Sequence, residues 1–214
     1  MASKFSTRTP KEFNLFRKIF QYIACNIVIL NIVRAKYNLK KTKGLENIDR
    51  TKKYIVAGNH ITGFDPFSIA ATLNMTIAYM AKVQLFEKFW SMLLMDGCGA
   101  FAVDREKVEV STIKTALSVK KTKWHLGIFP QGTRCTNGKL ENFTTGFASI
   151  AKKMDIDILP VGILIKENPK SKKKDIQFSV GPAISCKGSI EEIVEKWATT
   201  VSKLAELEYT PIIA

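Results

Sequence analysis

Residues 54–66 have the sequence Tyr-Ile-Val-Ala-Gly-Asn-His-Ile-Thr-Gly-Phe-Asp-Pro, in which three structural signals follow one another. The four residues from Tyr54 to Ala57 form a short apolar run and predict a buried strand. Gly63 favours a turn, and Pro66 favours the first turn of a helix. The order of strand, turn and helix is typical of an α/β fold.

Short apolar runs and helical patterns alternate along the chain after Gly44. Further strands are predicted over residues 76–80, 100–103, 124–129, 156–165 and 176–180, and helices over residues 85–95, 108–121, 144–153 and 189–207. Ser189 is the predicted N-cap of the last of these helices. The alternation predicts an α/β protein with a mixed, largely parallel central sheet flanked by helices.

The first forty residues contain one long apolar run, Ile19–Val33, with basic residues on both sides. At about 1.5 Å per residue this run reaches roughly 22 Å, which is shorter than the roughly 30 Å hydrocarbon core of a bilayer. One strongly apolar helix face is predicted by the spacing of Phe13, Phe16, Phe20 and Ile27. We therefore expect a helix over residues 11–34, continuous or broken, that lies in a membrane interface; the alternative is a helix packed on the domain core.

The composition limits the class of protein. The 214 residues include 33 Lys and Arg against 19 Asp and Glu, a formal charge of +14, and 46% of the residues are hydrophobic. That hydrophobic share supports a folded core and argues against a disordered or fibrous protein. The charge favours a polyanionic partner. Because no interleaved aromatic and basic residues resemble an RNA-binding motif, we expect an anionic membrane surface and no nucleic acid.

Cysteine and histidine are too sparse for a typical zinc site. The four cysteines are widely spaced without a CxxC pair, and the two histidines are His60 and His125. We therefore expect no metal, and reduced thiols in a cytosolic setting. His125 lies within an apolar stretch and is interpreted as a structural residue.

His60 and Asp65 are the strongest candidates for chemistry. On a continuous helix, a spacing of five residues would separate their side chains by about 140°, so the two would not meet. A turn at Gly63 can instead fold the carboxylate back onto the imidazole, where it would fix the tautomer and stabilise the protonated ring. Asp65 before Pro66 is also a good helix N-cap. The alternative is a surface His–Asp pair without a catalytic role.

Three further segments are expected at strand ends or in loops, on the side of the sheet where open α/β folds bind ligands. These segments are Ala81–Lys82, Gly99–Arg105 and Phe129–Arg134. We expect them to face the same crevice as His60.

The motif from His60 to Asp65 is followed by three segments: Ala102–Arg105, Phe129–Arg134 and Ile158–Gly162. In order and spacing this set resembles the four sequence blocks of the glycerolipid acyltransferases, and it is most similar to the bacterial 1-acyl-sn-glycerol-3-phosphate (lysophosphatidic acid) acyltransferases. The resemblance implies two regions. Residues 1–43 would be an N-terminal membrane-associated helical segment, and residues 44–214 would be the acyltransferase catalytic domain.

The resemblance also implies roles for individual residues. His60 would be the general base that removes the proton from the acceptor hydroxyl, and Asp65 would orient it. The residues that would bind the substrate, chiefly its phosphate, are Lys82, Arg105, Gln131, Gly132, Thr133 and Arg134. The residues that would shape the site are Asn59, Gly63, Pro66 and Pro160.

Gln131 departs from the family pattern, which usually has Glu at this position. Gln keeps the shape and the carbonyl acceptor but has no negative charge, so it cannot form an ion pair or act as a base. Because the base role falls to His60, we expect the carboxylate to be dispensable. The alternative is a site tuned to a different acceptor.

The reaction implied by the resemblance is direct attack of the acceptor hydroxyl on an acyl thioester, without a covalent acyl-enzyme, a cofactor or a metal. The donor would be an acyl-carrier protein or acyl-CoA thioester. Its acyl chain would occupy a tunnel walled by apolar residues of the segment 73–95, unless these residues form the core instead. Acylation of lysophosphatidic acid would give phosphatidic acid for phospholipid synthesis.

The protein would then be peripheral or monotopic at the cytoplasmic face of the cell membrane. Two other functions stay open. One is acyl transfer to another lysolipid or to an amino-lipid acceptor. The other is a non-catalytic basic protein that binds anionic lipid.

Overall fold

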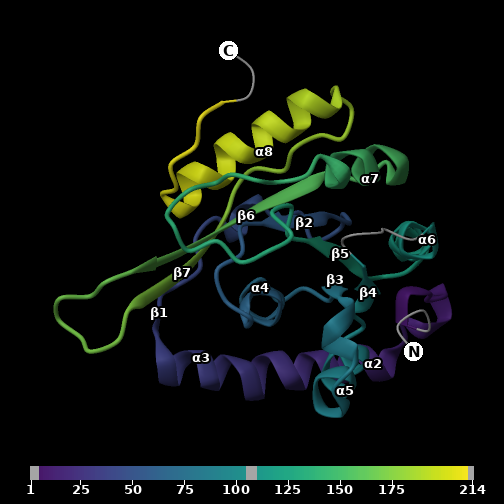
Figure 1. The fold of residues 1–214 in the computed structure, drawn as a ribbon, viewed down its shortest axis with the longest axis horizontal. Coiled ribbons are helices and arrows are strands. Elements are labelled where there is room, and N and C mark those ends of the chain that lie inside the picture. The colour runs from purple at the N-terminus through teal and green to yellow at the C-terminus, as the bar shows by residue number, and fades with distance from the viewer. Residues whose placement is uncertain (1–4, 105–109, 212–214) are drawn as a thin grey trace.

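The computed structural model describes residues 5–104 and 110–211, and its described strands form one sheet in the order β1-β7-β6-β2-β5-β3-β4 (Figure 1). The strands are β1 (Asn38–Leu39), β2 (Ile55–Gly58), β3 (Ile77–Lys82), β4 (Phe101–Val103), β5 (His125–Ile128), β6 (Ile158–Lys166) and β7 (Asp175–Val180). Neighbouring strands are parallel except for β6 and β7, which are antiparallel. The predicted mixed, largely parallel sheet is confirmed.

Helices cover both faces of this sheet (Figure 1). One face carries α2 (Leu15–Ile23), α3 (Leu30–Lys36), α4 (Asp65–Thr72) and α5 (Phe89–Gly97), and the other carries α6 (Val110–Ser118), α7 (Gly146–Met154) and α8 (Ile190–Ala205). Short 3₁₀ turns are η1 (Pro10–Glu12), η3 (Leu45–Asn47), η4 (Val83–Phe86) and η5 (Val119–Lys121), and η2 (Ala24–Ile29) is a π-helix. Ser189 caps α8 as predicted, since its side chain accepts a hydrogen bond from Glu192 N.

The central strand β2 is buried on both faces, which explains its unbroken apolar sequence. Ile55 and Ala57 face α7 and α8, and Val56 faces the opposite layer. The indole N–H of Trp197 on α8 donates to the Ala57 carbonyl and fixes that layer on the strand. β2 therefore gives the loop that follows it a rigid support.

The N-terminal helical segment begins four residues later and ends two residues later than the predicted helix over residues 11–34. Helical backbone runs without a break from Leu15 to Lys36 through the π-helix η2. At about 1.5 Å per residue these 22 residues extend roughly 33 Å, and the helix is long and apolar enough to cross a membrane by length and composition. The expected single apolar face is wrong in part: Phe13 precedes the helix and packs on Trp124, and Phe20 packs over Gly97.

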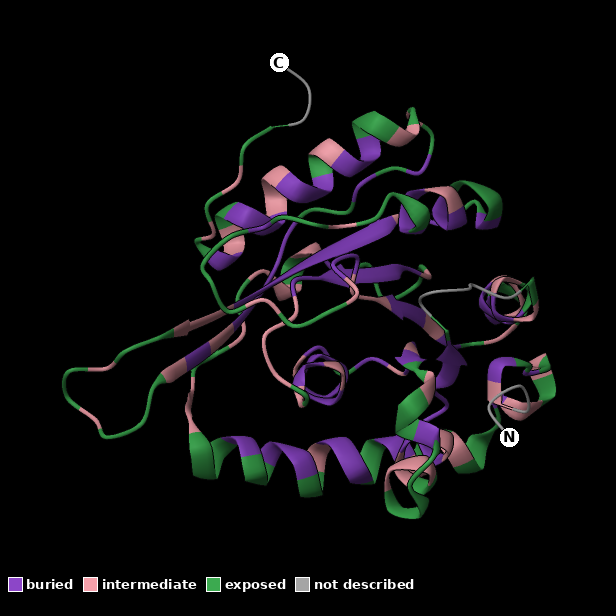
Figure 2. Ribbon diagram, in the orientation of Figure 1, coloured by how far each residue is buried: buried purple, intermediate pink, exposed green. Residues whose placement is uncertain are grey.

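One side of this helix belongs to the domain core (Figure 2). Gln21 is 5% exposed and forms three hydrogen bonds, two from its amide nitrogen to the carbonyls of Ile77 and Cys98 and one from Ile77 N to its oxygen. Such a buried amide ties the helix firmly to the sheet, since an unpaired one would be costly.

The other side of the helix is apolar and exposed. The apolar face consists of Leu15, Phe16, Ile19, Tyr22, Ile23, Ile27, Val28 and Ile32, continued on α5 by Phe89, Trp90 and Leu93. Phe16 is 72% exposed and Trp90 is 78% exposed. The exposed side of the helix therefore suits the predicted membrane contact, and its buried side suits the alternative, packing on the domain core.

His125 has the structural role expected of it. Its Nδ1 accepts a hydrogen bond from Tyr54 N at the start of the central strand. Burial, with Lys53 and Arg50 nearby, lowers the pKa of His125 to about 4. The ring is therefore neutral at physiological pH and serves as an acceptor.

Candidate active site

His60 and Asp65 meet at the carboxyl end of β2. The distance from His60 Nδ1 to Asp65 Oδ2 is 2.8 Å, as the sequence led us to expect from a turn between them. His60 is the second residue after β2, and Asp65 is the first residue of α4. The strand and the helix thus hold the two side chains against each other.

The Asp65 side chain is fully buried and accepts several hydrogen bonds. Besides the imidazole, Oδ2 accepts from Ile61 N at 2.6 Å and from Thr62 N at 2.8 Å, and Oδ1 accepts from Thr62 Oγ1 at 2.6 Å. The prediction that Asp65 also caps α4 is wrong, because these donors all precede the helix and no side-chain cap bond forms. The carboxylate instead organises the His60 loop.

This geometry fixes which nitrogen of the His60 ring carries the proton. A carboxylate only accepts, so Nδ1 carries the proton that it donates to Asp65, and Nε2 keeps its lone pair. The ring stacks on Phe129 with centroids 4.2 Å apart, and Phe129 stacks on Tyr79 at 5.4 Å. An imidazole oriented in this way can take a proton from a hydroxyl.

Sequence reasoning missed the role of Thr62 and the ring stacking of Phe129 and Tyr79, although Phe129 was expected to face the same crevice as His60. Thr62 lies inside the motif, three residues before Asp65, and a hydroxyl so close to a carboxylate was a usable signal for a hydrogen bond between them. The stacking of Phe129 and Tyr79 depends on β5 and β3 lying side by side, which no local pattern reveals. The Tyr79 hydroxyl is buried, and burial raises its pKa, so the phenol stays neutral.

Gln131 supports the His60 loop rather than facing open solvent. It is 5% exposed, its Oε1 accepts from His60 N at 3.4 Å, and its Nε2 donates to the Glu141 carbonyl at 3.4 Å. The second contact needs an N–H donor, which a glutamate carboxylate would not supply.

The turn after β5 presents the next residues to the site. Gly132 has φ +67°, a conformation that favours glycine, and a Cβ there would meet no atom within 4 Å. Glycine is therefore needed for its backbone and not for space. Thr133 and Arg134 follow and are exposed, and Cys135 N donates to the His60 carbonyl, which ties this turn to the motif loop.

Asn59 and Pro160 act within the sheet. The Asn59 amide bonds both the N–H and the carbonyl of Ile163, so it extends the β2–β6 ladder by one residue. Pro160 pairs with Ala57 inside β6, and its carbonyl accepts from Gly181 N. The expectation that Pro160 shapes the site is therefore wrong: it is the third residue of β6 and lines neither cavity described below.

The other predicted site residues divide into two groups. Gly63, Pro66, Lys82, Thr133 and Arg134 line one cavity together with His60. Among the described residues, neither Lys82 nor Arg134 has an ion-pair partner. Arg105 lies outside the described residues.

This cavity, the inner pocket, encloses about 360 Å³ between the sheet and the N-terminal helix. Its buried end is lined by Gln21, Cys25 and Cys98, and its exposed end by Lys82, Thr133 and Arg134. Of the apolar residues expected in a tunnel, Met80, Leu85 and Met95 line it. A hydrogen bond to Cys25, together with burial, raises the pKa of Cys98, so the buried end is uncharged.

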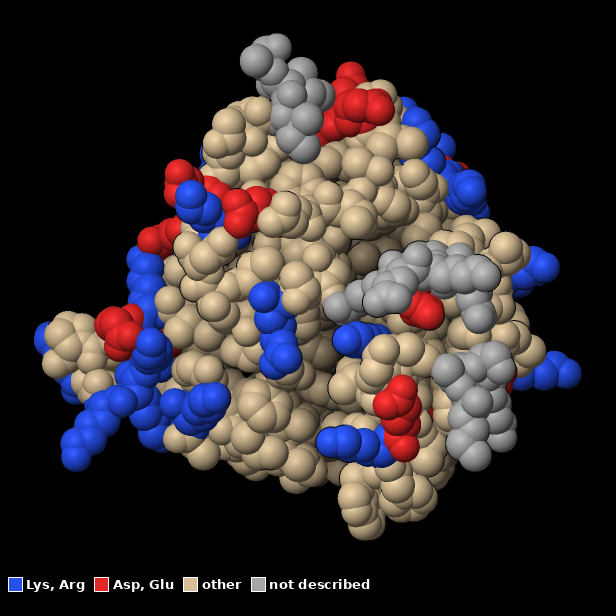
Figure 3. Space-filling view, viewed as in Figure 1, with Lys and Arg blue, Asp and Glu red and all other residues tan. Residues whose placement is uncertain are grey.

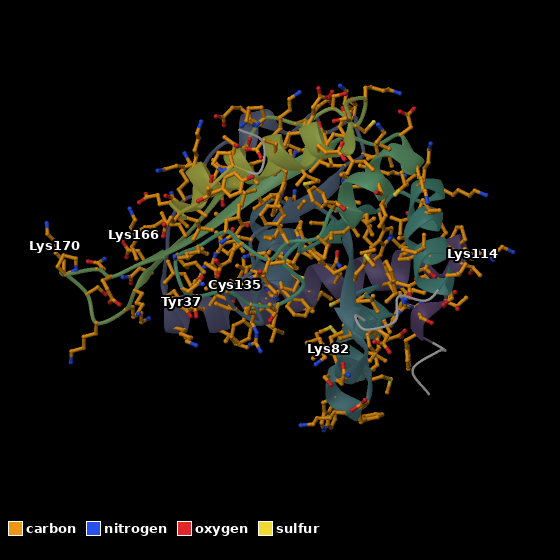
Figure 4. The ribbon with its side chains drawn as sticks, turned by 45° about the horizontal axis from the view of Figure 1, so that its top comes forward. Tyr37, Lys82, Lys114, Cys135, Lys166 and Lys170 are labelled. Atoms are coloured by element: carbon orange, nitrogen blue, oxygen red, sulfur yellow. The ribbon has the colours of Figure 1, made fainter. Side chains whose placement is uncertain are left out.

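A second cavity, the outer groove, encloses about 700 Å³ and shares Gly63 and Arg134 with the inner pocket. Figure 4 shows Tyr37 and Cys135, which line the groove, between Lys82 at the inner pocket and Lys166 and Lys170 on the β6–β7 hairpin. Figure 3 shows basic side chains gathered over that hairpin and the end of α3. The His60 loop thus lies where the exposed end of the inner pocket, with Lys82 and Arg134, meets a basic groove.

No group of three or more His, Cys, Asp and Glu side chains that could hold a metal ion occurs among residues 5–104 and 110–211. The described site offers the His60 imidazole held by Asp65 and the two cations Lys82 and Arg134.

Comparison with known proteins gives similar sequences from several kingdoms, each named 1-acyl-sn-glycerol-3-phosphate acyltransferase. The Streptococcus pneumoniae protein is 32% identical over 68% of this chain and 54% of its own length. The Bacillus subtilis protein is 35% identical over 44% of this chain and 48% of its length, and the Saccharomyces cerevisiae protein is 30% identical over 81% and 62%. The chain spans about half the length of the first two relatives.

The fold has a counterpart among solved structures. The crystal structure of PlsC, the 1-acyl-sn-glycerophosphate (LPA) acyltransferase of Thermotoga maritima, has a TM-score of 0.62 and 22% identity, and the match covers 91% of this chain and 78% of that one. The family model described as Acyltransferase matches residues 40–164, which is more than half of the chain and includes the His60 loop and the Gln131–Arg134 turn. The chain therefore belongs to the acyltransferase family.

Proposed function

We propose that the protein transfers a fatty acyl group from an acyl thioester to the free hydroxyl of lysophosphatidic acid and so produces phosphatidic acid. The observation that carries this proposal is the His60–Asp65 pair beside a pocket whose buried end is uncharged and whose exposed end carries cations without ion-pair partners among the described residues. The similar proteins, whose names state this activity, support the choice of acceptor.

The proposed reaction has one base and no covalent acyl-enzyme. Nε2 of His60 takes the proton of the acceptor hydroxyl while its oxygen attacks the thioester carbonyl carbon. The Asp65 carboxylate stabilises the imidazolium that forms. The carbon–sulfur bond then breaks, and the imidazolium returns the proton to the leaving thiolate, so a free thiol and an ester result.

Cations at the mouth of the inner pocket would hold the acceptor phosphate. Arg134 suits this task because a guanidinium binds phosphate oxygens in a bidentate way, and Lys82 lies at the same exposed end of the pocket. Arg105, which matches the family's second block, is proposed as the third cation. Gln131 holds the His60 loop in this proposal and need not touch the substrate.

The inner pocket would take the acyl chain of the donor. Its buried end is uncharged, and each methylene that leaves water for such a place contributes about 0.8 kcal/mol. Gln21 and Cys25 come from the N-terminal helix, so the helix forms part of the wall. Residues 44–214 would thus supply the catalytic groups and residues 1–43 would complete the pocket.

The same segment, residues 1–43, would hold the protein on the cytoplasmic face of the membrane. The apolar face of the helix and α5 is a large exposed patch of the kind that inserts into a lipid interface. A spanning orientation would require the Gln21 hydrogen bonds to the sheet to break, which favours a helix that lies in the interface.

The test offers the purified protein a panel of acceptors with a labelled acyl thioester and identifies the products by mass. The panel contains lysophosphatidic acid, the choline and ethanolamine lysolipids, and an amino-lipid. Phosphatidic acid should form at least tenfold faster than any other product. A faster reaction with another acceptor would contradict the assigned substrate, and vesicle binding without thioester consumption would contradict enzymatic activity altogether.

A further inference from the structure

The two cavities meet at the residues closest to the proposed chemistry. Gly63 and Arg134 line both the inner pocket and the outer groove, and His60 lines the inner pocket. If the acyl chain fills the inner pocket and its carbonyl lies at His60, the thiol-bearing part of the donor must leave in another direction. The outer groove begins at this junction.

The groove walls carry positive charge. Its basic residues are Lys36 at the end of α3, Arg134, and Lys174 at the start of β7, and its acidic residue is Glu206. Glu206 already pairs with Lys166 at 2.5 Å, and Lys174 pairs with Glu167 in an exposed bridge of the kind that contributes little. The groove therefore favours an anionic ligand.

The floor of the groove contains an open strand edge. β2 ends opposite Val161, so β6 continues without a neighbouring strand on that side. Ile163 is covered there by the Asn59 amide. Every second residue of a strand directs its backbone N–H and carbonyl to the same side, so those of Ile165 point the same way as those of Ile163. Among the described residues, no turn, loop or side-chain hydrogen bond involves either group of Ile165, which lines the groove.

The strand register supports this direction independently. Ile165 lies opposite Ile176 in the antiparallel pair. The Ile176 carbonyl accepts from Lys40 N on the far side of β7, so Ile176 turns its backbone groups away from β6. The Ile165 groups then turn away from β7 and toward the groove, where an extended amide-containing ligand can pair with them.

We propose that the outer groove binds the 4′-phosphopantetheine arm of the acyl donor, with its amides along the Ile165 edge and its phosphate near Lys36 and Lys174. This inference rests on the proposed acyl transfer. Both coenzyme A and acyl-carrier protein present this arm, so the groove recognises what the two donors share. The thiol released at His60 leaves through the same groove.

The experiment combines Lys36→Glu with Lys174→Glu. Its matched control combines Lys153→Glu with Lys196→Glu on α7 and α8, which changes the net charge equally at exposed positions that line neither cavity. Three donors carry the same acyl chain: acyl-CoA, acyl-carrier protein, and the N-acetylcysteamine thioester, which has an amide but no phosphate. The groove variant should raise KM at least tenfold for the first two donors. KM for the third donor and for lysophosphatidic acid should change less than twofold.

A rise in KM for lysophosphatidic acid instead would overturn the inference and assign the groove to the acceptor phosphate. An equal rise in the control would show a general charge effect and would also overturn it. Calorimetric titration with coenzyme A alone separates this inference from the proposed function, because binding needs no turnover. Wild-type protein and the control should bind it and the groove variant should not. An absence of binding to wild type would refute the groove site, whereas binding without any acyl transfer would refute only the proposed function.

Discussion

Replacement of Asp65 by Asn tests how the carboxylate contributes to the proposed reaction. The amide oxygen of Asn can still accept from the His60 ring and from the backbone of Ile61 and Thr62, so the loop should keep its shape. What disappears is the negative charge beside an imidazole that becomes positive during the reaction. The change therefore isolates electrostatic stabilisation from positioning.

The magnitude follows from the geometry. The Nδ1–Oδ2 distance is 2.8 Å, and both charges are spread over their groups. A separation of about 4 Å between charge centres at an effective dielectric of about 20 gives about 4 kcal/mol. At about 1.4 kcal/mol for each factor of ten, kcat should fall roughly a thousandfold.

Initial rates of phosphatidic acid formation give kcat and KM for the variant. KM for both substrates should change less than about threefold, because the contact acts on a charge that exists only during reaction. Thr62→Val is the matched control: it removes the hydroxyl bond to Oδ1 and keeps the charge, so its loss should stay within about tenfold. A loss below tenfold for Asp65→Asn would refute the role given to the carboxylate.

Three further changes probe the rest of the structure. Gln131→Glu removes the donor to the Glu141 carbonyl but not the acceptor for His60 N, so kcat should stay within about tenfold of wild type, and a hundredfold loss in the transfer assay would mean that the neutral side chain has a direct role. Gly127→Ala would drive a Cβ into the Tyr79 ring, so urea unfolding should show a loss of about 1–3 kcal/mol, and unchanged stability would contradict this packing. The folded-state pKa of His125 is about 4 against an ordinary 6.5, so the unfolded chain binds more protons between these values, and the free energy of unfolding should fall by up to about 3 kcal/mol as pH drops from 6.5 to 4. In His125→Asn this part of the pH dependence should vanish from urea titrations, and an unaltered slope would show that another group is responsible.

Much of the site could be predicted because its signals are local. The strand, turn and helix of residues 54–66 lie within a few residues of one another, so chain geometry alone brings the Asp65 carboxylate back to His60. The cap of α8 by Ser189 is local in the same way. The alternation of short apolar runs with helical patterns along the chain is also a local signal, and it predicts the type of sheet.

Other features depend on contacts between distant segments and could not be read from a pattern. Gln21 appeared as a polar interruption in an apolar run, whereas in the fold its amide bonds Ile77 and Cys98 and closes the inner pocket. The two-residue strand β1 exists only because β7 offers it a parallel edge. Pro160 lies inside a strand as predicted, and only its assignment to the site is wrong, because whether a strand residue lines a cavity depends on the segments packed around it.

The continuous helix shows a similar limit. The apolar run Ile19–Val33 is too short for a bilayer, but the helix that contains it, Leu15–Lys36, is long and apolar enough to cross one. Asn26 and Asn31 donate back to the carbonyls of Tyr22 and Ile27 within the helix. These polar side chains break the apolar run in the sequence, but the helix continues through them.

The most direct measurement of the central claim compares wild-type protein with His60→Asn in the acylation of lysophosphatidic acid by a labelled acyl thioester, with the product identified by mass. The Asn side chain can keep an N–H directed at Asp65 but has no second ring nitrogen to accept a proton. Wild type should form phosphatidic acid, and the variant should lose at least about a hundredfold in kcat while its melting temperature and its binding of lysophosphatidic acid persist. A variant that forms phosphatidic acid at the wild-type rate would contradict the assignment of His60 as the base.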